Sequence, residues 1–276
     1  MAPRVSIIIP VFNAGDTLPA TLASVAAQTF RDFETIVVDD GSTDARTIAQ
    51  VDAAGAQPGI TVHRTPNRGP ALARNFGIER ARGAYILPLD ADDTLAPAYL
   101  ARTVPVLDAD PTLGVAYTWV GLTGRHHGTW RTGGFGIPEL LTRCTIHVTS
   151  LYRREVWEQV GGYDPRFKES CEDWDFWLGA AQRGWRGTCV PEELVFYRRT
   201  AGSRELAARA PGVSAGLMRS LVQKHRPLYE ANLEEAMAGM YDRLAAAGVA
   251  LERIYHHPAV RALVWLRGRL GLTRPR

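Results

Sequence analysis

Short apolar runs recur through the first 90 residues, and they are separated by stretches in which apolar side chains have the spacing of a helix. The runs cover residues 5–10, 34–38, 61–63 and 85–89, and apolar side chains recur every three or four positions over 16–28 and 71–81. Runs that are apolar at successive positions are typical of strands buried on both faces, and strands alternating with helices form parallel sheets. The sequence therefore predicts an α/β protein with a mainly parallel, doubly wound sheet and helices on both faces.

The pattern changes after residue 110. We expect strands over 115–120 and 148–152, helices over 153–160 and 173–183, and a glycine-rich loop over 124–136. From about residue 203 the strand signal is weak, and three helices are predicted over 206–225, 228–247 and 251–270. This organisation predicts one domain over 1–202, with halves 1–110 and 111–202, followed by a helical extension over 203–276.

Charge and cysteine content exclude several protein classes. The net charge is +3, but residues 251–276 hold six arginines and one glutamate, so the first 250 residues are slightly acidic. Such a body argues against nucleic-acid binding. No apolar run reaches the roughly 18 residues of a membrane span, and the first run is too short for a signal peptide. Three cysteines at no metal-ligand spacing fit a reducing compartment, so a cytoplasmic protein is expected.

Acidic residues follow two of the predicted strands. Asp90 and Asp92 are spaced so that an extended chain presents both carboxylates to one cation, and hard oxygen ligands suit Mg²⁺ or Mn²⁺. Asp39 and Asp40 follow the second strand, where a carboxylate can accept a hydrogen bond from a nucleobase. Ligands bind beyond the carboxyl ends of strands in such sheets. Each cluster is also compatible with a solvated turn and a helix cap.

Taken in order, several segments resemble family 2 glycosyltransferases of the GT-A fold. The resemblance covers roughly residues 4–200 and is carried by the first strand through Asn13, Gln28–Asp44, Asn67–Gly77, Leu89–Asp93, Arg153–Val156, Val160–Asp164 and Glu172–Leu178. It implies an inverting enzyme of hexosyltransferase type that depends on a nucleotide-diphospho-sugar. Residues 1–110 would then bind the donor and residues 111–202 the acceptor.

The resemblance also implies roles for individual residues. The nucleotide-sugar site would comprise Pro10, Phe12, Asn13, Asp39, Asp40, Arg74, Asp90 and Ala91. Asp90 and Asp92 would bind Mn²⁺ or Mg²⁺, which draws charge from the departing diphosphate.

Asp173 would be the general base that deprotonates the acceptor hydroxyl, with Glu172 as the alternative base. Glu172, Trp174 and Arg198 would contact the acceptor or the diphosphate, although the spacing of Trp174 is equally compatible with a core residue. Ser170 is spaced to cap the helix that carries Asp173, and a carboxylate in a first helical turn is favoured in its ionised form. Thr200 stands where many relatives carry a metal-binding histidine, which weakens the expectation of metal dependence. Trp177 is predicted to be core.

Three histidines and the C-terminal basic segment are each compatible with more than one interpretation. His147 is interpreted as a packed core residue, and His126 and His127 as part of a solvated loop. The basic helix predicted over 251–270 either lies on an anionic membrane or packs on the catalytic domain or a second subunit.

The expected partners are therefore a nucleotide-diphospho-sugar, with a UDP-sugar as the expected donor, and a glycan or lipid-linked acceptor in cell-envelope synthesis. A membrane contact on the inner face and a homodimer stay open, and nucleic acid is excluded. A sugar nucleotidyltransferase is disfavoured because no basic, glycine-rich phosphate loop follows the first strand. The alternative function is a degenerate nucleotide-sugar or carbohydrate-binding module without transfer activity.

Overall fold

The computed structural model describes residues 2–125, 127–167, 170–199, 212–258 and 261. Within them, one mixed sheet has the order β3-β2-β1-β4-β8-β6-β9-β5, with β7 paired to β6. The strands are β1 (Val5–Val11), β2 (Phe33–Asp39), β3 (Ile60–Arg64), β4 (Tyr85–Pro88), β5 (Thr94–Leu95), β6 (Leu113–Gly124), β7 (Gly128–Trp130), β8 (Leu151–Arg153) and β9 (Arg186–Arg199). The first four in the sheet order are parallel, whereas β8 runs antiparallel to β4 and β6.

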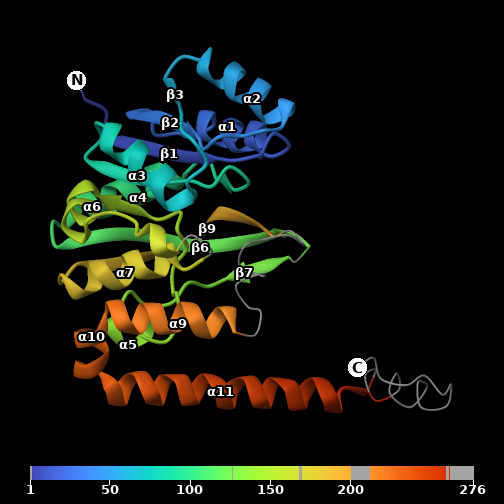
Figure 1. Cartoon of the computed structure of the whole chain (residues 1–276), viewed down its shortest axis with the longest axis vertical. Coiled ribbons are helices and arrows are strands. Elements are labelled where there is room, and N and C mark those ends of the chain that lie inside the picture. Colours follow the sequence, from blue (N-terminus) through green and yellow to red (C-terminus); the bar gives the residue numbers. More distant parts are fainter. Residues whose placement is uncertain (1, 126, 168–169, 200–211, 259–260, 262–276) are drawn as a thin grey trace.

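Helices cover both faces of the sheet, as predicted (Figure 1). On β1, Ile7 and Ile9 enter one core and Ile8 enters the other, which is why the strand is apolar at successive positions. The first core is formed with α1 (Leu18–Ala26), α2 (Ala45–Gly55) and α4 (Tyr99–Ala109). The second is formed with α3 (Pro70–Arg80), α6 (Arg154–Val160) and α7 (Glu172–Gln182).

The C-terminal helices pack beneath α7, so that the sheet, α7, α9 and α11 form successive layers (Figure 1). This part contains α5 (Ile137–Leu140), α9 (Val213–Lys224), α10 (Arg226–Ala231) and α11 (Leu233–His256), and a short 3₁₀ helix, η1 (Pro165–Phe167), precedes α7. Leu217, Leu221 and Leu228 belong to the same core as α7. The position of residue 203, the predicted start of the extension, lies outside the described residues.

Three details of the structure differ from the sequence-based prediction. Helix α11 continues through 247–251, where two separate helices were expected; a glycine such as Gly248 inside a helix costs only about 1 kcal/mol. Strand β9 was not predicted, and β7 lies in the segment interpreted as a loop. No helix among the described residues is long and apolar enough to cross a bilayer.

Candidate active site

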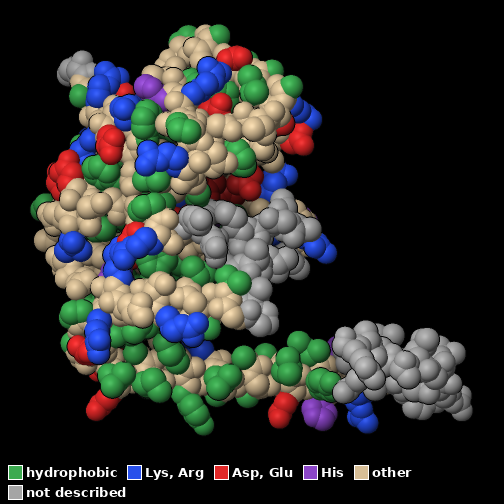
Figure 2. Space-filling view, viewed as in Figure 1, with side chains coloured by type: hydrophobic (Ala, Val, Ile, Leu, Met, Phe, Trp, Pro, Cys, Tyr) green, Lys and Arg blue, Asp and Glu red, His purple; other side chains and the backbone are tan. Residues whose placement is uncertain are grey.

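A single cleft of about 1520 Å³ opens at the carboxyl ends of β1, β2 and β4. Figure 2 shows acidic side chains gathered in a hollow at this level of the molecule. The cleft is lined by nearly all the residues that the sequence singled out: Pro10, Phe12, Asn13, Asp40, Arg74, Asp90, Ala91, Asp92, Glu172, Asp173, Trp174 and Arg198. Segments more than 130 residues apart in the chain thus share one cavity.

Asp39 and Asp40 have different surroundings although they are adjacent. Asp39 is buried, accepts a hydrogen bond from the Ser42 backbone N–H at 2.9 Å and does not line the cleft. Its carboxylate shapes the turn after β2. Asp40 lines the cleft and accepts hydrogen bonds from the backbone N–H groups of Arg68 (3.1 Å) and Gly69 (2.7 Å). Asp40 therefore fixes the start of α3. Of the two neighbouring aspartates, it is the one whose residue lines the cleft.

Asn13 joins the loop after β1 to the loop after β2. Its side-chain oxygen accepts hydrogen bonds from the backbone N–H groups of Thr43 (2.8 Å) and Asp44 (3.2 Å), and its own backbone has a positive φ of 49°. Asparagine tolerates this left-handed conformation better than most residues. Phe12 beside it is 48% exposed, so its ring is available to a ligand in the cleft.

The acidic cluster after β4 has the donor set of a divalent-cation site. Carboxylate oxygens of Asp90, Asp92 and Asp93 all lie within 4.8 Å of one another. Asp93 is fully buried, accepts a hydrogen bond from the Arg198 backbone N–H at 3.0 Å, and has a second oxygen with no hydrogen-bond partner. Burial, and then the neighbouring carboxylates, raise the pKa of Asp93 well above its ordinary value. A hard cation fits this set because it supplies the positive charge that three clustered carboxyl groups need.

Arg74 connects the two halves of the site. Its guanidinium is 1% exposed and donates to Asp90 at 2.6 Å and to Glu172 at 2.9 Å. Asp90 follows β4 and Glu172 begins α7, so one arginine joins the donor side to the acceptor side. The Glu172 carboxylate is 5% exposed and is held by this ion pair, which leaves Asp173 as the more accessible carboxylate of α7.

Asp173 lies in the first turn of α7, as expected, but the predicted cap is wrong. The N-cap is Cys171, with a φ of 72° and no side-chain cap, and not Ser170. One oxygen of Asp173 accepts from the Trp174 backbone N–H at 2.8 Å, and the other accepts from the Cys144 thiol at 3.7 Å. Burial raises the pKa of the Cys171 thiol to about 11 and that of Cys144 well above its ordinary value. Both thiols therefore stay protonated at neutral pH.

The tryptophans divide between core and cleft. Trp177 is fully buried, which confirms the prediction that it belongs to the core. Trp174 is half-buried, lines the cleft and donates its indole N–H to the Leu140 carbonyl at 2.5 Å. Its ring is thereby fixed beside Asp173.

His147 is a cleft residue that sequence reasoning missed. It is buried, as expected, but lies before β8 and lines the cleft, with Nε2 3.6 Å from Asp93. Its Nδ1 accepts a hydrogen bond from the Thr149 backbone N–H at 3.2 Å, which leaves the proton on Nε2, facing the acidic cluster. No motif in the sequence marked this position. His127 is exposed and does not line the cleft, and His126 lies outside the described residues.

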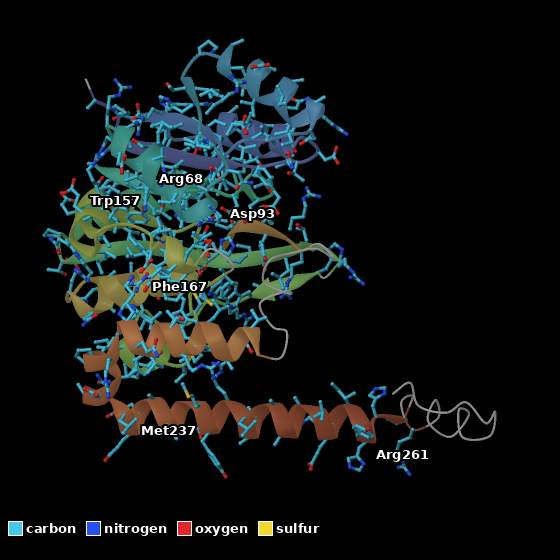
Figure 3. All side chains as sticks on the ribbon, in the orientation of Figure 1. Arg68, Asp93, Trp157, Phe167, Met237 and Arg261 are labelled. Carbon is cyan, nitrogen blue, oxygen red and sulfur yellow. The ribbon has the colours of Figure 1, made fainter. Side chains whose placement is uncertain are left out.

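Strand β9 closes the cleft beside the acidic cluster. Besides its bond to Asp93, Arg198 donates from Nε to the Asp92 carbonyl at 3.3 Å, so this side chain steadies the acidic loop. Figure 3 shows Asp93 beside this strand. Thr200, the position of the expected missing histidine, lies outside the described residues.

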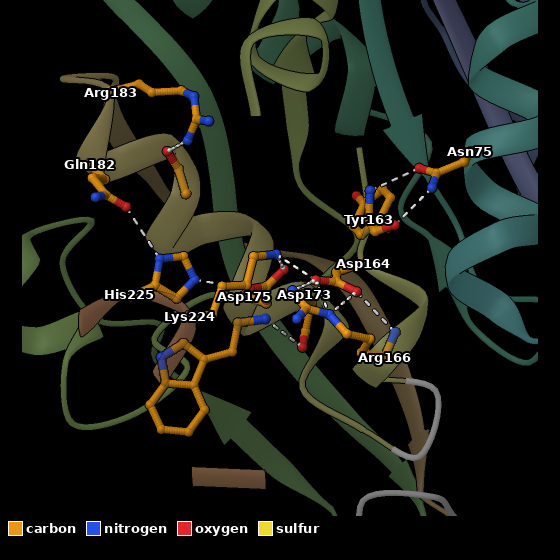
Figure 4. A network of polar contacts seen from close by, with 12 residues as sticks. Asn75, Tyr163, Asp164, Arg166, Asp173, Asp175, Gln182, Arg183, Lys224 and His225 are labelled. Carbon is orange, nitrogen blue, oxygen red and sulfur yellow. Dashed lines mark hydrogen bonds and ion pairs between the residues drawn. The ribbon is translucent and has the colours of Figure 1, made fainter. Parts of the chain in front are cut away.

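The C-terminal helices contribute the wall beyond Asp173. Leu217 and Met218 of α9 and Arg243 of α11 line the cleft, and Arg243 donates to the Thr142 carbonyl. Helix α9 is attached to α7 through Asp175, which is fully buried and accepts from Lys224 Nζ at 2.7 Å and from His225 Nε2 at 2.9 Å (Figure 4). The helix that carries Asp173 therefore also anchors the C-terminal helices.

Comparison with known proteins identifies the family. The profile described as glycosyl transferase family 2 matches residues 6–161, which is more than half of the chain. The chain is a family 2 glycosyltransferase. A curated relative, the PGL/p-HBAD biosynthesis glycosyltransferase of Mycobacterium tuberculosis, is 37% identical over 179 residues, covering 63% of this chain and 68% of the relative. Chondroitin synthase of Pasteurella multocida is 30% identical over 190 residues, covering 66% of this chain but 19% of that enzyme.

Solved structures of other proteins share the fold of this transferase. TarS from S. aureus in complex with UDP-GlcNAc has a TM-score of 0.67 at 22% identity, over 79% of this chain and 65% of that one. The mannosyltransferase PcManGT from Pyrobaculum calidifontis, in complex with GDP-Man and Mn²⁺, has a TM-score of 0.59 at 23% identity, over 100% of this chain and 82% of that one. The predicted GT-A fold is confirmed.

Proposed function

We propose that this glycosyltransferase moves a hexose from a nucleotide-diphospho-sugar, with a UDP-sugar as the expected donor, to a hydroxyl of a glycan or lipid-linked acceptor, with inversion at the anomeric carbon. The observation that carries the proposal is the placement of Asp40, Asp90, Asp92 and Asp173 on the wall of one cleft. Carboxylates from both halves of the chain would then face the two ends of one donor molecule.

On the donor side, Asp40 and Phe12 would contact the nucleoside, and Asp90 and Asp92 would hold Mn²⁺ or Mg²⁺. When bound, that cation supplies a Lewis acid for the diphosphate leaving group. Arg74 keeps Asp90 in place through its 2.6 Å hydrogen bond, and the Nε2 proton of His147 faces the same region. Arg198 would add a guanidinium for the phosphate oxygens.

On the acceptor side, Asp173 would accept the proton of the attacking hydroxyl. The first turn of α7 favours the ionised form of this carboxylate, and a general base must be ionised to act. A single direct displacement, with the base on the face opposite the leaving diphosphate, inverts the anomeric centre. Trp174 would pack against the acceptor sugar.

The acceptor class is supported by the cleft and by the relatives. Leu217 and Met218 give the wall beyond Asp173 an apolar surface, and Arg243 adds a positive charge. One relative carries PGL/p-HBAD biosynthesis in its name and another is a chondroitin synthase. We therefore place the reaction in cell-envelope glycolipid or polysaccharide synthesis, in the cytoplasm at the inner face of the membrane.

The test is a panel of nucleotide sugars with and without Mn²⁺ or Mg²⁺, read by thermal shift and by release of the nucleoside diphosphate. We expect one UDP-sugar to raise the melting temperature and to be hydrolysed slowly in the presence of the cation. Asp92→Asn should abolish the cation-dependent part of both signals, whereas the exposed control Asp52→Asn should retain them. Donor binding without turnover under any condition would favour the degenerate binding module instead.

A further inference from the structure

Helix α11 exposes an unusual amount of apolar surface. Among the described residues, ten large hydrophobic side chains are exposed, and eight of them lie on this helix: Leu233, Met237, Tyr241, Leu244, Val249, Leu251, Ile254 and Tyr255. Their exposed fractions run from 51% to 72%. Contiguous exposed apolar surface of this kind marks an interaction site. Figure 2 shows hydrophobic side chains along the helix.

Four of these residues fall in two rows that repeat every seven positions. One row contains Met237, Leu244 and Leu251, and a second contains Met240, Ala247 and Ile254. Rows with this spacing form the apolar stripe of a coiled-coil helix, which requires a partner helix. We name these two rows, with the adjacent Tyr241 and Tyr255, the α11 stripe.

The stripe does not face the catalytic part of the same molecule. The face that packs inward is marked by Ala236, which is 2% exposed, by Gly239, whose Cβ position would lie 2.9 Å from Thr142, and by Arg243. At about 100° per residue, the stripe is centred roughly a quarter turn away from that face. Toward Arg261, α11 extends beyond the end of α9 (Figures 1 and 3).

We propose that two copies of this chain associate through the α11 stripe as an antiparallel helix pair. Glu234 and Glu235 lie in the first turn of the helix, whereas Arg253 lies in its last turn and Arg261 follows it. An antiparallel arrangement brings the acidic end of each helix beside the basic end of the other. A parallel arrangement would place like charges together at both ends.

A register with Leu244 on the two-fold axis also matches the volumes of the facing side chains. It places Met237 opposite Leu251 of the other copy, and the large Tyr241 opposite the small Ala247. Each contact occurs twice because a two-fold interface is formed by the same surface on both copies.

The area of the stripe suffices for a stable dimer. At roughly 100 Å² for each half-exposed large side chain, the six exposed large residues of the α11 stripe offer about 600 Å² per copy. Two copies together would bury about 1,200 Å², which lies at the lower end of the range for specific interfaces. The helix is about 36 Å long at 1.5 Å per residue, which accommodates all the paired positions.

Sedimentation equilibrium of the full chain tests the proposal. We expect twice the 30.3 kDa of one chain at micromolar concentration. Leu244→Glu should weaken association by at least about 100-fold, because it places two carboxylates on the axis. Val249→Glu is the matched control: Val249 is 51% exposed on the opposite face of the helix, so this variant should remain dimeric. Circular dichroism should show both variants folded.

Cross-linking tests the direction of the pair. An equimolar mixture of Met237→Cys and Leu251→Cys chains should form a mixed disulfide on mild oxidation with copper phenanthroline, and the unsubstituted chain is the background control. Cross-linking of Met237→Cys only to itself would indicate a parallel pair and overturn the antiparallel proposal. If the unsubstituted chain sediments as a monomer, the dimer proposal is overturned. If the unsubstituted chain binds vesicles of phosphatidylcholine and phosphatidylglycerol, and Leu244→Glu abolishes this binding, the stripe is a membrane-binding surface instead. None of these outcomes depends on the proposed activity.

Discussion

Replacing Asp175 should separate the C-terminal helices from the catalytic part of the molecule. Its carboxylate is fully buried and accepts hydrogen bonds from Lys224 and His225 at the end of α9. Asp175→Ala removes both acceptors. Lys224 retains Asp164, 2.9 Å away, but the 4%-exposed side chain of His225 loses its carboxylate partner.

The expected loss of stability follows from this difference. Breaking a buried ion pair costs about 3–5 kcal/mol, and the retained Lys224 contact places this case near 3 kcal/mol. Asp175→Asn keeps one oxygen as an acceptor and should cost about 1–2 kcal/mol. For a chain of this size, the melting temperature should fall by roughly 6–12 °C in the alanine variant.

Calorimetry and urea unfolding measure these values. The control is Asp52→Ala, because Asp52 is 62% exposed and pairs with Arg64 at the surface, where such a pair is worth about 1 kcal/mol or less. Limited proteolysis should cut the alanine variant within α9 faster than the unsubstituted chain. An alanine variant as stable as the control would show that the buried network does not anchor these helices.

Three further predictions concern packing, pH and the central arginine. Gly77→Ala should destabilise the fold by about 1–3 kcal/mol in urea unfolding, since its Cβ would lie 2.6 Å from the side chain of Ile8, whereas Gly216→Ala in open space should stabilise it slightly. Burial alone would raise the pKa of Asp164, but its hydrogen bonds to Arg166 and Lys224 have the larger effect, so the net pKa in the folded protein is lowered. The stability that Asp164 contributes is therefore complete above about pH 4 and is lost as the pH falls through the lower folded pKa. Asp164→Asn should accordingly reduce the fall in the urea-unfolding midpoint between pH 5 and 2. Arg74→Lys should reduce donor hydrolysis at least tenfold and lower the melting temperature, because one ammonium cannot hold two carboxylates as the guanidinium does; unchanged values would refute the bridging role.

The sequence predicted those elements whose local pattern matches their final surroundings. The first strand is apolar at successive positions because both faces of the sheet are covered, and that pattern is visible before folding. Strand β9 is different: it contains Pro191 and two glutamates, and it pairs with β6 through a register shift, so long-range pairing overrides its local composition. The continuity of α11 through Gly248 was likewise hidden, because a glycine weakens a helix without ending it.

The candidate site shows the same division. Acidic residues at strand ends could be assigned to one edge of the sheet from topology alone, and Asp40, Asp90 and Asp92 do line the cleft. Sequence reasoning could not separate Asp39 from Asp40, since only the turn geometry directs one carboxylate toward Ser42. His147 was missed because the chain between two strands brings it to the cleft without any motif.

The most direct test of the account is the effect of Asp173→Asn on donor affinity and on turnover, measured separately. Asparagine has the same shape but cannot accept the acceptor proton, so the dissociation constant of the nucleotide sugar should stay within about twofold while transfer falls by roughly 10²–10⁴-fold. Transfer at near-normal rates would contradict the assignment of Asp173 as the base. Equal loss of donor binding and transfer would mean that this carboxylate belongs to the donor site instead.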